Sequence, residues 1–166
     1  ATVFALPVTF FGYSLSEEIV PLFLEDPKTR ALAIDYTSIA FISLVFSVYS
    51  FVFVGFYTGI EKTKIQMTVT ILSNFINLYL NAALIYGSEG IDLFFKEFAP
   101  SLSFLKVMWS WTHFPAMGVK GAALATLIAS GWMTFHYAFY LFSGDLRKRF
   151  KVFCFSFDKE MLWGQL

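Results

Sequence analysis

Three long stretches of this chain contain no Asp, Glu, Lys or Arg, and they limit what it can fold into. They are residues 36–60, 65–88 and 121–144, each 24 or 25 residues long. A helix of that length reaches roughly 36 Å at about 1.5 Å per residue, which is enough to cross a bilayer core of about 30 Å. A core helix of a soluble domain normally keeps a charged face towards water. The stretches therefore predict three transmembrane helices.

The composition agrees with a membrane protein. Hydrophobic residues make up 57% of the chain and charged residues 14%, against roughly 45–50% and about 25% in soluble domains. A fourth uncharged stretch, residues 1–16, begins without Met and without a basic flank, so we expect the end of a further helix rather than a signal peptide. The chain is thus expected to be an internal fragment of a larger, polytopic, all-α helix bundle.

The charged residues alternate in sign along the chain although the net charge is zero. Basic residues dominate at 61–64 and 145–151, whereas acidic residues outnumber basic ones at 14–35 and 87–119. Loops rich in Lys and Arg stay on the cytoplasmic side of membrane proteins. We therefore expect the two basic loops to face the cytoplasm and the other two segments to face outward.

Local signals mark where two of the helices begin and end. Asp26 before Pro27 is typical of a helix start, with Asp26 as N-cap and Pro27 in the first turn. Gly87 is typical of a helix end. The segment 88–116 is rich in aromatic residues but contains Pro100 and Pro115, which favours an interfacial, aromatic segment over another span.

A stripe of polar residues follows one face of the second predicted span. Three of its members fall within about 60° of one another at about 100° per residue, and two more extend the stripe: Asn74, Asn77 and Asn81, with Gln66 and Thr70. An amide in hydrocarbon needs a partner or a cavity. Two interpretations stay open, namely hydrogen bonds between helices, and the lining of a space visited by water or an ion.

Weaker polar patterns occur in the other two spans. Residues that share one face of the first span are Tyr36, Ser43, Ser47 and Ser50, and we expect the serines to bond their own backbone. The third span begins with small residues that permit close helix packing, including Gly121 and Ala125. Thr126 lies beside them, and packing does not explain where it points.

The sequence lacks the patterns of enzyme active sites. It has no nucleophile–base pair, no metal-ligand spacing and no phosphate-binding loop, and its lone Cys154 excludes an internal disulfide. We therefore expect neither an enzyme nor a nucleic-acid-binding protein.

Two motifs resemble one family of membrane transporters. Residues 59–67, followed by the three asparagines and by Leu84-Ile85-Tyr86-Gly87, are similar to the region of the fourth and fifth helices of multidrug and toxic compound extrusion (MATE) transporters. Residues 117–126 resemble the start of their sixth helix. The resemblance covers about residues 20–150.

The resemblance implies a fragment of a transporter with two lobes and twelve helices. Residues 1–150 would be part of the N-terminal lobe, from the end of helix three to helix six, and residues 151–166 a cytoplasmic connector to the C-terminal lobe. The implied function is antiport across the cell membrane, in which organic, often cationic, compounds leave in exchange for sodium ions or protons. The implied partners are small organic substrates, the lipid bilayer and the remainder of the same chain, but no nucleic acid.

The resemblance also implies which residues bind the coupling cation. The matching positions are Tyr36, Asn77, Asn81 and Thr126. Expected residues lining a cavity beside them are Gln66, Thr70, Asn74 and Ser47. Some family members carry an acid where Asn81 stands, and an amide cannot titrate, so this position favours sodium over a proton. No cofactor other than sodium is expected.

Two alternative functions stay open at this point. A lipid or oligosaccharide flippase of related fold would need a larger, more basic cavity, for which only Lys120 offers a hint. A membrane scaffold that transports nothing would need the asparagines for assembly alone.

Overall fold

The computed structural model describes residues 2–97, 100–110, 113–143 and 146, and this part of the chain is helical without any strand. The α-helices are α1 (Thr2–Ile19), α2 (Pro27–Gly59), α3 (Thr63–Glu97) and α4 (Gly118–Phe142), and the 3₁₀ helices are η1 (Val20–Leu22) and η2 (Pro100–Met108). The predicted all-α fold is confirmed. The expected connector at 151–166 lies outside the described residues.

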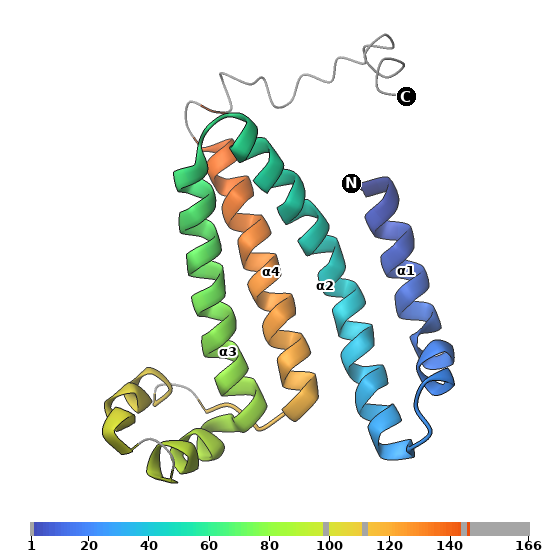
Figure 1. Ribbon diagram of the computed structural model, residues 1–166, viewed down its shortest axis with the longest axis vertical. Coiled ribbons are helices and arrows are strands. Elements are labelled where there is room, and N and C mark those ends of the chain that lie inside the picture. The colour runs from blue at the N-terminus through green and yellow to red at the C-terminus, as the bar shows by residue number, and fades with distance from the viewer. Residues whose placement is uncertain (1, 98–99, 111–112, 144–145, 147–166) are drawn as a thin grey trace.

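The long helices stand side by side in one layer (Figure 1). α4 lies between α3 and α2 and packs against both, and α1 lies on the far side of α2. The chain ascends α2, descends α3 and ascends α4 in this view, so α2 and α4 are parallel. We call the end with the turn at residues 60–62 the inner end, and the end with Gly87 and Gly118 the outer end.

The signals that mark helix boundaries act as the sequence predicts. The Asp26 carboxylate caps α2 by accepting hydrogen bonds from the Thr29 backbone N–H at 2.8 Å and from its hydroxyl at 2.6 Å, and Pro27 opens the helix. Gly87 breaks α3 with φ 68° and ψ 177°, a conformation that glycine alone adopts without strain. Beyond this break Ser88–Glu97 is helical again, which the sequence did not reveal.

Two of the helices, α2 and α3, are long and apolar enough to cross a membrane. They have 33 and 35 residues, and their most apolar windows of 18 residues have mean hydropathies of 2.3 and 1.4. Only 11% and 22% of their most apolar windows are buried, whereas a core helix of a soluble protein is mostly buried. α4 has the length, with 25 residues, but it falls short in hydropathy because it carries Thr, Ser, His and Tyr. That α4 spans the membrane stays a prediction.

Small residues bring α3 and α4 into close contact, as expected. A Cβ added to Gly121 would overlap the Leu84 carbonyl, so the two helices meet backbone to backbone there. The Met117 N–H donates to the same Leu84 oxygen at 2.8 Å. Further along, Ser73 donates to the carbonyl of Ala129 at 2.9 Å. This seam holds the polar stripe of α3 beside α4.

Aromatic rings close the inner end of the layer. Tyr57 of α2, Val69 of α3 and Tyr137 of α4 are fully buried. The two tyrosine rings stack at 5.5 Å, and the Tyr57 hydroxyl donates to the Tyr137 carbonyl at 2.8 Å. All three helices are therefore tied together at this end.

Candidate functional site

One face of α4 carries residues that contact both α2 and α3. The candidate site lies on this side of the layer. Val119, Thr126 and Tyr137 fall within about 20° of one another around the helix at about 100° per residue. Val119 shares a surface hollow with Tyr36 of α2, and the Tyr137 hydroxyl lies 3.2 Å from that of Thr70 on α3. We call this side of the α2–α4 layer the polar face.

The inner part of the α3 stripe is bonded to other helices. Gln66 accepts a hydrogen bond from the Thr58 hydroxyl of α2 at 3.0 Å. Thr70 contacts Tyr137, whose hydroxyl also lies 3.4 Å from the Gln66 carbonyl. Gln66 and Thr70 thus bond to other helices, and both also line a surface hollow of about 470 Å³, so this part of the stripe fits both interpretations.

The outer part of the stripe behaves differently. Asn81 donates from its Nδ2 to the Oδ1 of Asn77 at 2.8 Å, one turn away on the same helix. Both side chains are half-buried, and Asn74 is exposed. The bond occupies the Oδ1 of Asn77 and leaves the Oδ1 of Asn81 outside it.

Of the predicted site residues on α2, one is exposed at the surface and the other is bonded within the helix. Tyr36 is 42% exposed and lies at a hollow of about 370 Å³. The other residues around this hollow are Thr29, Leu32, Ala33, Thr37 and Val119. Ser47, by contrast, is half-buried and donates to the Ser43 carbonyl at 3.2 Å. The expectation that the serines of this face bond their own backbone is confirmed for Ser43 and Ser47, but it is wrong for Ser50, whose hydroxyl lies 2.9 Å from the Thr134 hydroxyl of α4.

Thr126 is exposed on the polar face, seven residues after Val119. Its hydroxyl donates to the Ala122 carbonyl at 3.1 Å, and the lone pairs of that oxygen stay available to a further donor or a cation. Packing against α2 or α3 does not account for this residue, in agreement with the sequence analysis.

The four predicted cation-binding residues do not all lie at one level. Counted from Gly87, Asn81 and Asn77 lie about 9 and 15 Å into the helix, and Thr126 lies about 12 Å beyond Gly118. Tyr36 is closer to the outer end, because its neighbour Asp35 pairs with Lys120 at 3.6 Å. The structure thus brings Asn77, Asn81 and Thr126 to a common level, with Tyr36 nearer the outer end.

The chemistry available on the polar face is that of neutral oxygen ligands. Amide and hydroxyl oxygens suit hard cations, and the exposed ring of Tyr36 could contact an organic cation. Among the described residues, no group of three or more His, Cys, Asp or Glu could hold a metal ion. The acid nearest to these oxygens along α2 is Asp35, which is engaged by Lys120.

Sequence reasoning missed two features of this face. The first is the closure by Tyr57 and Tyr137, and the second is the ion pair of Asp35 with Lys120. Tyr137 follows Thr126 by eleven residues, a spacing that places both on one helix face. That spacing was a usable signal, whereas no sequence pattern linked Tyr57 to its partner 80 residues later.

Comparison with known proteins gives two matches. The family model described as MatE matches residues 1–83, which is half of the chain. The curated "Probable multidrug resistance protein NorM" of Thermotoga maritima is 33% identical over 87 residues, or 52% of this chain. The aligned part is 14% of that protein, so the chain spans only a small part of its relative. No solved structure matches the chain.

Proposed function

Because the chain belongs to the MatE family, we propose that it is part of a secondary active transporter that exports small organic compounds, many of them cationic. Export is driven by the inward flow of a cation, in the alternating-access manner of transporters built from repeats. Residues 1–150 form part of the N-terminal lobe of a multi-pass protein of the cell membrane, and 151–166 lead to the second lobe. The family consists of transporters, in line with the absence of enzyme motifs.

The observation that carries this proposal is the Asn77–Asn81 pair. Its amides lie on an apolar helix, half-buried, and bond each other instead of a second helix. Amides needed only for assembly are expected to bond across a helix interface. Thr126 adds a hydroxyl oxygen at a similar depth on α4, so three oxygen-bearing side chains lie at one level of the layer where packing does not require them.

We propose sodium as the coupling ion at this level. The Oδ1 of Asn81 lies outside the bond to Asn77 and is a neutral ligand of the kind that hard cations accept. An amide side chain does not ionise near neutral pH, which speaks against proton coupling at this position. In this proposal Tyr36, which lies nearer the outer end, contacts the ion or the organic substrate as either passes.

The structure weakens the support for a flippase. Lys120, the one basic residue that hinted at a headgroup site, is paired with Asp35. The scaffold alternative differs from the transporter in one measurable respect, because a scaffold needs Asn77 and Asn81 only for assembly.

The test is cation-driven transport by the intact protein in lipid vesicles. We expect Asn77→Ala and Asn81→Ala each to reduce sodium-driven transport of a fluorescent organic cation at least tenfold. The matched control is Thr68→Ala, since Thr68 is exposed on α3 and lies about 180° around the helix from Asn77. This control should transport at the wild-type rate.

Two results would count against the proposal. If transport by the wild type did not depend on the sodium gradient, sodium would not be the coupling ion. Unchanged transport in both asparagine variants, together with weaker assembly on size-exclusion chromatography, would favour the scaffold.

A further inference from the structure

The part of α3 beyond Gly87 and the 3₁₀ helix η2 form a unit that leaves and rejoins the bundle at one point. We call residues 88–110 the outer unit. The Ser88 N–H donates to the Phe114 carbonyl at 3.1 Å, and the Phe114 N–H donates to the Ser88 hydroxyl at 3.0 Å. Gly87 lies so close to this junction that an added Cβ would be 2.7 Å from the Ala116 nitrogen. The unit is therefore tied to the break in α3.

The outer unit folds back along the flank of α3 that lies away from the polar face. The Trp109 ring stacks on Tyr79 at 5.4 Å with an interplanar angle of 8°, and its Nε1–H donates to the Tyr79 carbonyl at 3.2 Å. Tyr79 precedes Gly87 by eight residues, or about 12 Å of helix, and lies about 200° around α3 from Asn81. The unit thus extends from the outer end of α3 towards the inner end by about 12 Å. α3 is one of the helices that are long and apolar enough to cross a membrane.

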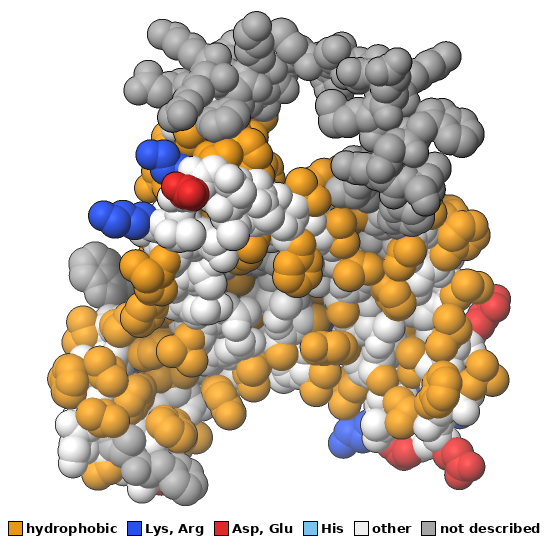
Figure 2. Space-filling model, turned by 45° about the horizontal axis from the view of Figure 1, so that its top comes forward, with side chains coloured by type: hydrophobic (Ala, Val, Ile, Leu, Met, Phe, Trp, Pro, Cys, Tyr) orange, Lys and Arg blue, Asp and Glu red, His pale blue; other side chains and the backbone are white. Residues whose placement is uncertain are grey.

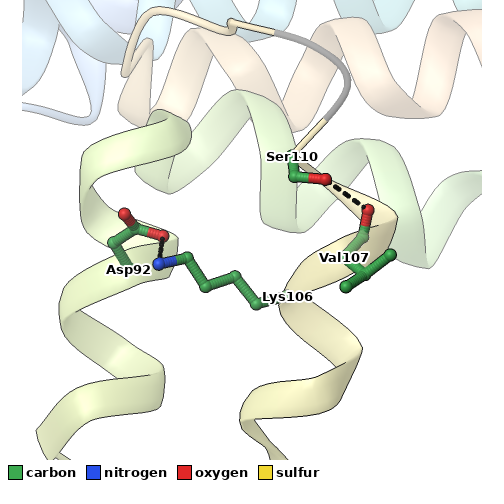
Figure 3. A network of polar contacts seen from close by, with 4 residues as sticks. All are labelled: Asp92, Lys106, Val107 and Ser110. Atoms are coloured by element: carbon green, nitrogen blue, oxygen red, sulfur yellow. Dashed lines mark hydrogen bonds and ion pairs between the residues drawn. The ribbon is translucent and has the colours of Figure 1, made fainter.

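The 3₁₀ helix η2 separates charged from apolar side chains by its threefold period, in which residues three apart share an edge. Lys106 lies on one edge and pairs with Asp92 of the α3 extension at 2.7 Å. Phe104 and Val107 lie on another edge and are 67% and 62% exposed. Figure 3 shows Lys106 reaching across to Asp92 while Val107 points away from that pair.

Two unlike sides result. One side has a polar hollow of about 320 Å³, whose charged and polar lining includes Glu89, Asp92, Lys106, Ser110 and His113. Outside this hollow the unit exposes large apolar side chains, which are Leu93, Phe94, Leu102, Phe104, Val107 and Met108. In Figure 2 the outer unit, at the lower left, presents hydrophobic side chains in the direction of the inner end.

We propose that the outer unit is an anchor in the outer leaflet of the bilayer, with its apolar side among the lipid chains and its polar hollow towards water. Exposed apolar patches of this kind mark interaction surfaces, and this one continues the apolar surface of α3, which also exposes Phe75 and Leu78. Amphipathic elements of this type lie in the plane of the membrane interface. The proposal rests on α3 crossing the membrane, and it does not depend on the coupling ion.

Anchoring at this place has a consequence for α3. The unit is attached at Gly87, and Trp109 clamps it to Tyr79. Lipid contact by Phe104 and Val107 therefore holds the outer end of α3 at the interface, on the side opposite to the asparagine pair.

The test compares two nearby positions of the intact protein in phosphatidylcholine nanodiscs. After Cys154→Ser, single cysteines are introduced as Val107→Cys and Ser110→Cys and spin-labelled. Both native side chains are exposed, so they are matched for labelling. We expect the label at position 107 to collide with oxygen, which concentrates in lipid, at least threefold more than with a water-soluble nickel complex. The label at position 110 should show the reverse preference.

Each other outcome overturns the proposal. Equal access of the nickel complex to both labels would place the apolar side in water. A label at position 107 that neither reagent reaches would assign this side to a protein partner, such as a second copy of the chain. Phe104→Cys provides a second apolar position, and a monodisperse elution profile establishes that each variant is folded. Transport assays with the asparagine variants are independent of this result, so either proposal can fail alone.

Discussion

The inner and outer halves of the α2–α4 layer are built on different principles. At the inner end, Tyr57, Val69 and Tyr137 fill the space between the helices, and the Tyr57 hydroxyl bonds to α4. In the outer half the contact between α3 and α4 is made by small residues such as Gly121. The larger side chains on the polar face there are amides and hydroxyls, and Thr126 is exposed.

This difference bears on where the proposed cation site lies. Rings that stack and bond across helices leave no room for water between them, so the space between α2, α3 and α4 is filled at the inner end, and the hollow beside Gln66 and Thr70 lies at the surface. Small residues bring backbones together without using the polar side chains beside them. Those side chains stay available in the outer half, at the level of Asn77, and the predictions below test whether the two halves are separable.

The largest effect on stability is expected from Gly121→Ala. Its Cβ would overlap the Leu84 carbonyl, which is backbone and cannot move aside, so α3 and α4 must separate. Overpacking of this kind costs about 1–3 kcal/mol. The free energy of unfolding in detergent micelles measures it.

Gly131→Ala is the matched control for this glycine. It lies on the same helix, and an added Cβ would meet nothing within 4 Å. We expect this variant to unfold like the wild type or to be slightly more stable, because alanine favours the helix. Equal losses in both variants would show that the seam is not the cause.

The next effect concerns the closed inner end. Tyr57→Phe keeps the ring and removes the hydroxyl that donates to the Tyr137 carbonyl at 2.8 Å. Hydrogen bonds between membrane helices contribute about 0.6 kcal/mol on average and at most about 1.7 kcal/mol. We expect the free energy of unfolding to fall by an amount in that range. Transport, which depends on Asn77 and Asn81, should be retained. A loss of transport as large as in Asn77→Ala would show that the two halves act as one.

The sequence predicted those parts of the fold that depend on local chemistry. Asp26 with Pro27 starts α2, and Gly87 breaks α3, because capping and positive φ are properties of single positions. The small residues of α4 predicted its close contact with α3. Family membership, predicted from motifs over about residues 20–150, is confirmed by a match to residues 1–83.

Features that depend on contacts between distant residues could not be predicted. Tyr57 lies in a long apolar stretch, and no pattern in that stretch predicts its contact with Tyr137. The outer unit was expected to be interfacial, but its stacking of Trp109 on Tyr79 requires knowing that the chain folds back. The level of Tyr36 relative to Asn77 likewise follows from how the helices are staggered.

A smaller effect is expected at the outer rim. Asp35→Asn removes the ion pair with Lys120 that links α2 to α4 at 3.6 Å. Both side chains are about half exposed, and exposed pairs contribute roughly 0–1 kcal/mol. We expect a loss of stability near the lower end of this range, measured by thermal unfolding. The loss should disappear in about 1 M salt. A larger loss that salt does not change would mean that the rim is a structural closure like the inner end.

The smallest effect is a pH dependence of the cap of α2. Hydrogen bonds from the Thr29 hydroxyl and backbone N–H hold the pKa of Asp26 below its ordinary value of 3.8. A carboxyl whose pKa is lowered by folding stabilises the protein above the pKa of the unfolded chain, and this contribution is lost as the pH falls through the folded value.

Asp26→Asn keeps a capping side chain without the charge. The difference in unfolding temperature between wild type and variant should therefore be constant from pH 7 to about pH 5 and shrink below about pH 3.8. A difference that persists at pH 2 would show that the cap acts through geometry alone. In either case the inner end, where this carboxylate takes no part, should keep its hydrogen-exchange protection across the whole range.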